Sequence, residues 1–79
     1  MIMFFKSKNK YEGQLEDAQA VQIDGQMIGD LFVTAEFTSG WYVALCGRLG
    51  FSNAQFATRK DAVKFMKLVA YAEAHDFNY

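Results

Sequence analysis

The spacing of apolar residues indicates one helix, which runs from Thr58 to about His75. Apolar positions recur there every three or four residues, as on the side of a helix that lies against a sheet. The residues on that side are Ala62, Phe65, Met66, Val69 and Ala72. Thr58 is placed to cap the helix, and Asp61, three residues later, completes a start that resembles a capping box beside the positive end of the helix dipole.

Before this helix, apolar and polar residues alternate with a period of two, which indicates β-strands. The predicted strands cover 1–6, about 18–24, about 28–37, 41–47 and 51–57. The pairs Asp24-Gly25 and Ser39-Gly40 predict turns, and a further hairpin turn is expected around 47–50. Segment 7–13 has no periodicity and is predicted as a loop, whereas 14–17 fits either a helical turn or the start of a strand. The first strand is apolar on both sides, as expected of a strand covered on both faces or inserted into the sheet.

These elements predict an α+β fold: an antiparallel β-meander of four to five strands with one C-terminal α-helix packed on one face. At 79 residues the chain is expected to be a single small domain that covers 1–79. The expected core brings strand residues against one side of the helix. It comprises Val21, Ile23, Leu31, Val33, Trp41, Val43 and Leu45, which meet Phe65, Met66 and Val69.

The opposite sheet face is the first candidate site. One helix covers one face, so this second face is expected to lack an internal cover. It mixes acids with aromatic and small apolar residues, a composition typical of a partner surface or a homodimer interface. The predicted partner-binding residues are Asp30, Phe32, Thr34, Glu36 and Tyr42, with Ala44 and Cys46 beside them.

Charge is strongly segregated along the chain, although the net charge is only -1. The opening arm carries three lysines and no acid, and the chain from Tyr11 to Gly47 carries acids and no lysine or arginine. Those acids are Glu12, Glu16, Asp17, Asp24, Asp30 and Glu36. They could keep a hairpin soluble and block edge pairing. Alternatively, they could imitate the phosphate row of a nucleic acid and occupy the basic groove of a nucleic-acid-binding protein, which would make this chain an inhibitor.

The second candidate site is a basic stripe on the predicted helix. Lys60, Lys64, Lys67, Tyr71 and His75 follow one another at helical spacing. Lysines could neutralise phosphates while the Tyr71 ring stacks on a base, and Lys6, Lys8 and Lys10 could extend the footprint. The stripe could equally be an ordinary solvated helix face. The acidic half of the chain and its net charge speak against a stand-alone nucleic-acid-binding domain, which is normally basic.

A meander that leads through Phe56 and Thr58 into a helix resembles, in its order of elements, AP2-type and integrase arm-binding domains. This resemblance is confined to the order. The basic and aromatic strand residues with which those domains read a DNA groove are missing here, since the strands of this chain are acidic.

The residues give little support to catalysis. Cys46 and His75 are the only pair of classical nucleophile and base, and no motif surrounds either. A single cysteine excludes an internal disulfide, and one histidine with scattered carboxylates does not make a metal site. We therefore expect no enzyme activity, no cofactor and no metal. No apolar run approaches the length of a membrane span, and a cytoplasmic location is expected.

The sequence predicts a non-catalytic protein-interaction module, a stand-alone regulator or inhibitor of the kind carried by phages and mobile elements. It would dock on a larger partner, for example a nucleic-acid-binding protein, through the acidic and aromatic sheet face. The alternative is a nucleic-acid-binding module that uses Lys60, Lys64, Lys67 and Tyr71. A third hypothesis is a homodimer in which the open sheet face pairs with its own copy.

Overall fold

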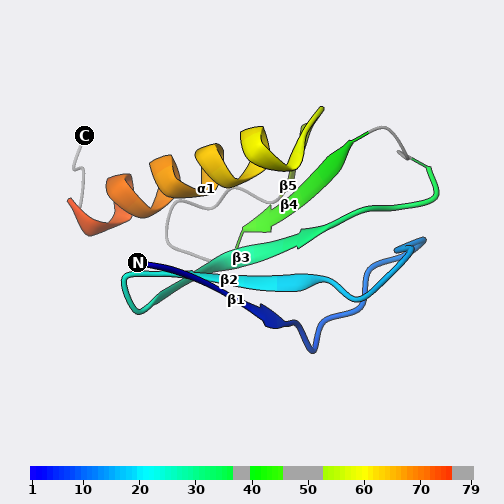
Figure 1. The fold of residues 1–79 in the computed structure, drawn as a ribbon, viewed down its shortest axis with the longest axis horizontal. Coiled ribbons are helices and arrows are strands. Elements are labelled where there is room, and N and C mark those ends of the chain that lie inside the picture. Colours follow the sequence, from blue (N-terminus) through cyan, green and yellow to red (C-terminus); the bar gives the residue numbers. More distant parts are fainter. Residues whose placement is uncertain (37–39, 46–52, 76–79) are drawn as a thin grey trace.

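The computed structural model describes residues 1–36, 40–45 and 53–75, which form a five-stranded antiparallel sheet with one helix against it (Figure 1). The predicted α+β fold is confirmed. Neighbouring strands in the sheet are also neighbours in the chain, so the topology is a simple meander. The elements are β1 (Ile2–Lys6), β2 (Gln19–Ile23), β3 (Gln26–Phe32), β4 (Trp41–Leu45), β5 (Asn53–Phe56) and α1 (Arg59–Ala74).

The hairpin between β2 and β3 turns at the predicted Asp24-Gly25 pair. Asp24 has a φ of 50° and Gly25 a φ of 81°, and Ile23 pairs with Gln26 across the turn. Two consecutive positive φ values are the signature of the two-residue turn whose twist matches that of the flanking strands. β3 therefore begins at Gln26, earlier than the predicted start near residue 28.

A bulge in β3 adds a core residue that the strict alternation did not predict. Val21 pairs with Gly29 and Gln22 with Met27, so Ile28 is an extra residue on the β3 side. Its side chain is almost fully buried and belongs to the core. The bulge thus turns Ile28 toward the helix while Met27 stays on the opposite face.

β3 ends at Phe32, earlier than the predicted end at residue 37, because the chain changes its pairing partner there. Beyond Phe32, the segment 33–35 pairs with 13–15: the Leu15 N–H donates to the Val33 carbonyl at 3.0 Å and the Ala35 N–H donates to the Gly13 carbonyl at 2.8 Å. The ambiguous segment 14–17 is therefore extended where it pairs, not a helical turn. Ser39, Cys46 and the predicted hairpin at 47–50 lie outside the described residues.

The predicted helix is confirmed as α1, with Thr58 as its N-cap. The Thr58 Oγ1 accepts a hydrogen bond from the Asp61 backbone N–H at 3.1 Å. No helix in the described part of the chain is long and apolar enough to cross a membrane. The core cluster comprises Val21, Ile23, Ile28, Leu31, Val43, Ala62, Met66, Val69 and Ala70, with Ile2, Trp41, Leu45, Phe56, Val63 and Phe65 partly buried against it.

Three details of the helix face differ from the sequence prediction. Phe65 and Ala72 are only partly buried, whereas Ala70 is buried. Glu73 is also buried and accepts a hydrogen bond from the Gln26 side-chain amide at 3.2 Å. The buried side of α1 is therefore rotated from the predicted one, since Glu73 has a polar partner at the start of β3 that the apolar spacing could not show.

The expectation that the first strand is covered on both faces is wrong. β1 lies at the edge of the sheet and pairs only with β2 among the described residues. The helix packs over β3, β4 and β5, so it leaves β1 outside its footprint. Met3, Phe4 and Phe5 are consequently exposed, each by about two fifths of its surface.

The close contact of β3 with β4 at Gly29 generates the first prediction. A Cβ atom at position 29 would lie 2.3 Å from the Ala44 carbonyl oxygen and 2.9 Å from the Leu45 Cα. Both are backbone atoms, so the two central strands would have to separate. We expect Gly29→Ala to lower the free energy of unfolding by about 3 kcal/mol, measured by urea denaturation.

Gly25→Ala is the matched control. An added Cβ at position 25 meets nothing within 4 Å, and the only penalty is the positive φ of 81°. That penalty is about 1 kcal/mol. Equal losses in the two variants would show that β3 and β4 do not approach as closely as described.

Candidate functional site

Phe32, the predicted anchor of the sheet-face site, lies in the middle of an aromatic stack. Its ring is nearly parallel to that of Tyr11, with centroids 4.1 Å apart, and to that of Tyr42, with centroids 5.6 Å apart. Phe32 and Tyr42 are direct neighbours across β3 and β4, as their alternation predicts. Tyr11 comes from the long connection between β1 and β2, residues 7–18, which we call the cover loop. Phe32 is thus buried by the chain's own tyrosine.

Asp30 fastens the cover loop to the sheet. Its Oδ2 accepts hydrogen bonds from the Asn9 side-chain amide at 2.8 Å and from the Tyr11 hydroxyl at 2.5 Å. Asp30 is 5% exposed, so its charge is held almost entirely by these donors. A buried carboxylate needs such partners, and removal of one would leave the remaining charge poorly compensated.

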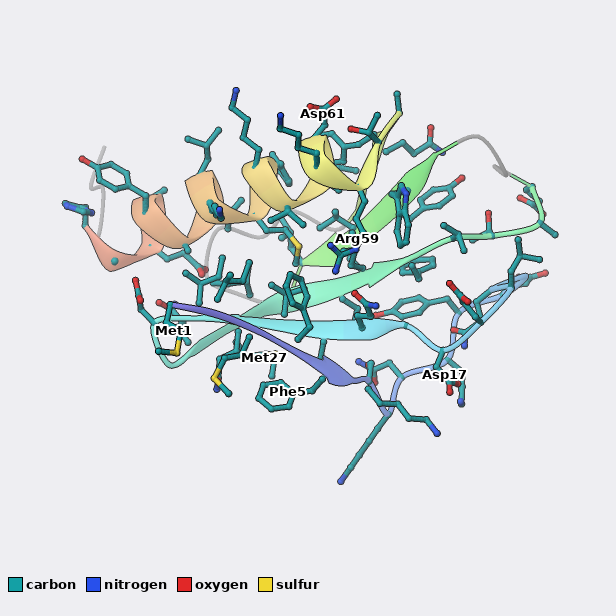
Figure 2. The ribbon with its side chains drawn as sticks, viewed as in Figure 1. Met1, Phe5, Asp17, Met27, Arg59 and Asp61 are labelled. Atoms are coloured by element: carbon teal, nitrogen blue, oxygen red, sulfur yellow. The ribbon has the colours of Figure 1, made fainter. Side chains whose placement is uncertain are left out.

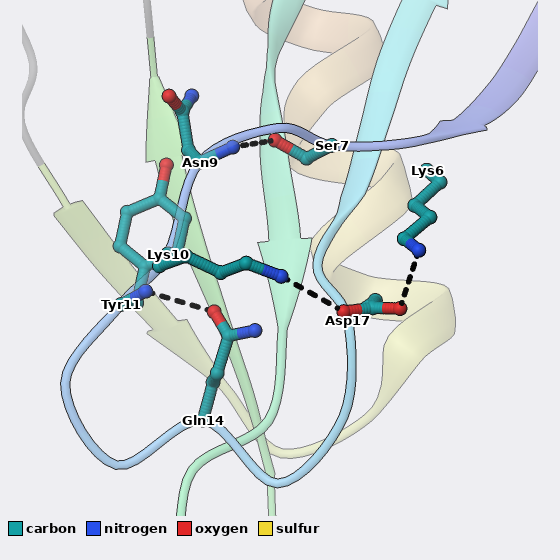
Figure 3. A network of polar contacts seen from close by, with 7 residues as sticks. All are labelled: Lys6, Ser7, Asn9, Lys10, Tyr11, Gln14 and Asp17. Atoms are coloured by element: carbon teal, nitrogen blue, oxygen red, sulfur yellow. Dashed lines mark hydrogen bonds and ion pairs between the residues drawn. The ribbon is translucent and has the colours of Figure 1, made fainter.

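The cover loop is also braced internally, as Figure 3 shows. The Asn9 backbone N–H donates to Ser7 Oγ at 3.1 Å, and the Tyr11 backbone N–H donates to the Gln14 side-chain oxygen at 2.8 Å. Ser7, where the loop begins, is buried. These bonds order the backbone on both sides of Tyr11 and so help to hold its ring against the sheet.

The expectation that this sheet face lacks an internal cover is therefore wrong for its central residues. Asp30, Phe32 and Thr34 are buried, Tyr42 is half-buried, and only Glu36 is exposed. The physical reason is that a loop of this length can cross the face that the helix leaves free, and it carries Tyr11 to fill the space. A partner-binding role for these five residues stays a prediction that nothing has tested, and it would require displacement of the cover loop.

The lysines of the opening arm and the acidic stretch meet in space instead of forming two separate regions. Asp17 lies between Lys10, whose Nζ is 3.2 Å from one carboxylate oxygen, and Lys6, whose Nζ is 3.3 Å from the other (Figure 3). The hydrogen bond from Lys10, and then that from Lys6, lowers the pKa of Asp17 below its usual range. Because all three groups are exposed to water, the ion pairs add little to stability.

An open apolar patch does exist on the outer face of the sheet, the face away from α1, but at the other end from the predicted one. Pairing places Met3 beside Gln22, Gln22 beside Met27, and Phe5 beside Ala20 on this face. Met3, Phe5 and Met27 are 43%, 44% and 43% exposed. We call these three residues the outer patch; Figure 2 shows Phe5 and Met27 near each other on the side of the sheet away from the helix.

Two hollows flank the end of β1. The outer hollow, of about 280 Å³, lies over the outer face; Phe5, Ala20, Met27, Lys8 and Asp30 are among its lining residues. The edge hollow, of about 350 Å³, is lined by Phe4, Phe5, Lys6, Asp17, Ala18 and Gln19. Phe5 and Lys6 line both hollows, so the end of β1 forms the ridge between them.

The Phe4 side chain faces the helix side of the sheet, where its ring contacts the guanidinium of Arg59. The guanidinium of Arg59, at the start of α1, lies 4.5 Å from the Phe4 ring centroid and 5.9 Å from that of Trp41. Arg59 also donates a hydrogen bond to the Gln19 side-chain oxygen at 2.8 Å. Arg59 therefore ties the first turn of the helix to β1 and β2, which lie beyond the helix's own footprint.

The basic stripe of the helix is exposed as the sequence predicts. Lys60, Lys64 and Lys67 are exposed and form no ion pair with any described residue. Together with Arg59 and Val63 they line a hollow of about 460 Å³ in which every described charge is positive. Tyr71 continues the stripe, and its ring contacts that of His75 with centroids 3.9 Å apart.

The structure offers no described grouping that would hold a metal ion. His75 is exposed at the end of α1, and its Nδ1 lies 2.8 Å from the Tyr71 carbonyl oxygen. Cys46, its hypothetical catalytic partner, lies outside the described residues. The absence of enzyme activity stays an expectation.

Sequence reasoning missed the outer patch and the cover loop for two different reasons. The apolar run at the start of the chain was assigned to a doubly covered strand, although apolar residues on both sides also fit an open edge that binds another strand. The signal for the cover was Tyr11, the one aromatic residue in the loop 7–13. A large aromatic residue in a polar loop commonly packs back on the domain.

The cover loop generates the second prediction. Tyr11→Phe keeps the ring that stacks on Phe32 but removes the hydroxyl that donates to Asp30. We expect the free energy of unfolding to fall by about 2 kcal/mol, because a hydrogen bond to a buried charged group is lost.

Tyr42→Phe removes a hydroxyl from the same stack and serves as the control. Its hydroxyl accepts from Gln55 at an exposed position, so we expect a loss below about 1 kcal/mol. Chemical denaturation monitored by circular dichroism measures both variants. Tyr11→Phe as stable as Tyr42→Phe would contradict the role given to Asp30.

Comparison of the chain with protein-family models, with curated proteins and with solved structures gives no match.

Proposed function

We propose that this protein is a non-catalytic protein-interaction module, a regulator or inhibitor that docks on a larger protein through β1 and the outer patch. The observation that carries the proposal is the combination of an edge strand, whose open side pairs with no described residue, with exposed apolar side chains on both of its faces. This retains the class of function that the sequence indicates and moves the binding surface from Phe32 and Tyr42 to Met3, Phe5 and Met27.

Edge strands of soluble domains are usually protected. Proteins place charges, proline or a bulge on an exposed edge to prevent another chain from pairing with it. β1 has the sequence Ile-Met-Phe-Phe-Lys, with a single charge at its end and three large apolar residues exposed. Such an edge supports the proposal of a partner, because unprotected apolar strands otherwise cause aggregation.

The position of the cover loop adds to this argument. The chain uses its own residues to bury Phe32 and Asp30, yet the cover ends before it reaches Met3 and Met27. The fold buries one half of this sheet face and leaves the other, apolar half exposed. An exposed apolar area of this kind is typical of a binding surface.

The third prediction tests this surface with variants that lose apolar area. Phe5→Ser combined with Met27→Ser removes two half-exposed side chains of the outer patch. We expect binding of the partner to weaken by about a hundredfold, since about 1 to 1.5 kcal/mol of burial is lost at each position. A pull-down from lysate of the source cells, treated with nuclease and analysed by mass spectrometry, measures which proteins are lost.

Leu68→Ser is the matched control, because Leu68 is 61% exposed on the helix, away from the outer patch. The partner should remain bound to this variant. If every specifically captured protein is retained by the Phe5/Met27 variant as well as by the Leu68 variant, the proposed surface is wrong.

A second candidate function is nucleic-acid binding by the basic stripe. The observation that favours it is the hollow lined by Arg59, Lys60, Val63, Lys64 and Lys67, which contains no described acid. Exposed lysines without ion pairs are available to phosphates. The net charge of -1 counts against it.

The fourth prediction separates this function from the first. If the basic stripe binds nucleic acid, affinity for a fluorescent single-stranded oligonucleotide falls steeply with salt, and Lys60→Gln with Lys64→Gln lowers the slope by about one to two counterions. Fluorescence anisotropy across a salt series measures it. Binding that is weak at low salt and identical in the two proteins would exclude this function.

A further inference from the structure

The backbone of β1 presents a regular row of hydrogen-bonding groups to its open side. The Met1 carbonyl accepts from the Asp24 N–H at 2.9 Å, and the Ser7 N–H donates to the Ala18 carbonyl at 2.8 Å, so these two residues point toward β2. In an antiparallel pair, residues alternate between pointing toward the partner and pointing away. Ile2, Phe4 and Lys6 therefore direct their N–H and C=O groups outward, where no described strand pairs with them.

An added strand would lie about 4.8 Å from β1 on the side away from β2, so its side chains would pack beside those of β1. Successive side chains of a strand point to opposite faces of the sheet. One side chain would lie against Phe5, which lines the outer hollow, and its neighbour would lie against Phe4, which lines the edge hollow. Main-chain bonds to an edge combined with hollows for alternate side chains are the elements of recognition by strand addition.

Charge at this end of β1 selects among possible strands. Four charged residues line the hollows: Lys6, Lys8, Asp17 and Asp30. Asp30 is buried and accepts two hydrogen bonds, and Asp17 is held by Lys10 and Lys6. Lys8 is exposed and forms no ion pair with a described residue. An acidic residue in the added strand would form an ion pair with Lys8.

A second copy of this chain fits less well than such a segment. If two β1 strands paired antiparallel around Phe4, Lys6 of each copy would face Ile2 of the other, and β1 itself contains no acid to meet Lys8. In such a dimer, neither β1 strand would supply an acidic partner for Lys8. The described charges therefore favour a different chain as occupant.

We infer that β1 takes up an extended segment of the partner as a sixth strand, and that this segment alternates apolar residues and carries an acidic residue near Lys8. The inference rests on the proposed function and names the chemistry of its partner. The outward groups of Ile2, Phe4 and Lys6 bind its backbone, and Phe5 and Phe4 contact its side chains on the two faces of the sheet.

The test uses random peptides displayed on phage and selected against the immobilised full-length protein. We expect the enriched peptides to alternate apolar residues and to contain Asp or Glu. A synthetic peptide of the enriched sequence should bind Lys8→Glu about tenfold more weakly than the wild type, which corresponds to the loss of one charge-assisted contact. A peptide in which the acidic residue is replaced by lysine should bind Lys8→Glu again.

A proline variant and a valine variant at position 4 test the backbone contacts. Phe4→Pro removes an N–H that points outward, so it breaks no bond to β2, whereas Phe4→Val loses the same ring and keeps the N–H. We expect the peptide to bind Phe4→Val and to lose at least about tenfold in affinity for Phe4→Pro. Equal binding to the two variants, or failure of the selection to enrich any peptide, would overturn the inference.

Amide hydrogen exchange gives a readout that does not depend on how the variants fold. In the free protein the amides of Phe4 and Lys6 should exchange rapidly and those of Met3 and Phe5 slowly, and the peptide should slow the exchange of Phe4 and Lys6. Unchanged exchange at both positions in the saturated complex would contradict strand addition.

Two further outcomes separate this inference from the proposed function. A captured protein that is lost with Phe5→Ser and Met27→Ser but retained by Phe4→Pro would support the interaction module and overturn strand addition. A stable dimer in analytical ultracentrifugation that Phe4→Pro dissociates would identify a second copy as the occupant and overturn the acidic segment.

Discussion

A sheet has two faces, and the described part of this chain has one helix with which to cover them. A helix with its side chains is about 10–12 Å across, and a sheet of five strands is about 19 Å wide, so α1 can cover only part of one face and nothing of the other. Its footprint is β3, β4 and β5. The packing of Tyr11 on Phe32, the exposure of β1 and the location of the outer patch all depend on this geometric limit.

The cover loop covers part of the sheet face that the helix leaves free. Tyr11 supplies a ring that stacks on Phe32, and its hydroxyl satisfies the buried carboxylate of Asp30. The loop is anchored at its far end by the pairing of 13–15 with 33–35. Because the loop reaches only one end of the outer face, the other end keeps Met3, Phe5 and Met27 in contact with water. The proposed binding surface is thus the area that neither cover reaches.

Electrostatics distinguish this surface from the basic stripe on α1. Around β1, Lys6 and Lys10 pair with Asp17, and Lys8 forms no ion pair with a described residue. Along the helix, Lys60, Lys64 and Lys67 lie in a row, and no described acid pairs with them. The surroundings of β1 suit a peptide segment that has both apolar side chains and a carboxylate. The basic stripe on α1 suits a polyanion.

Local signals in the sequence determined the helix from Thr58, the Asp24-Gly25 turn, the order of the strands and hence the α+β class, because each depends on periodicity or turn chemistry within a few residues. They did not determine which strand lies at the edge, where Tyr11 packs, or that Asp30, Phe32 and Thr34 are buried on the face opposite the helix. Those facts depend on contacts between residues far apart in the chain, such as Tyr11 with Phe32. Alternation assigns a residue to a face of a strand, but only the tertiary structure decides what lies against that face.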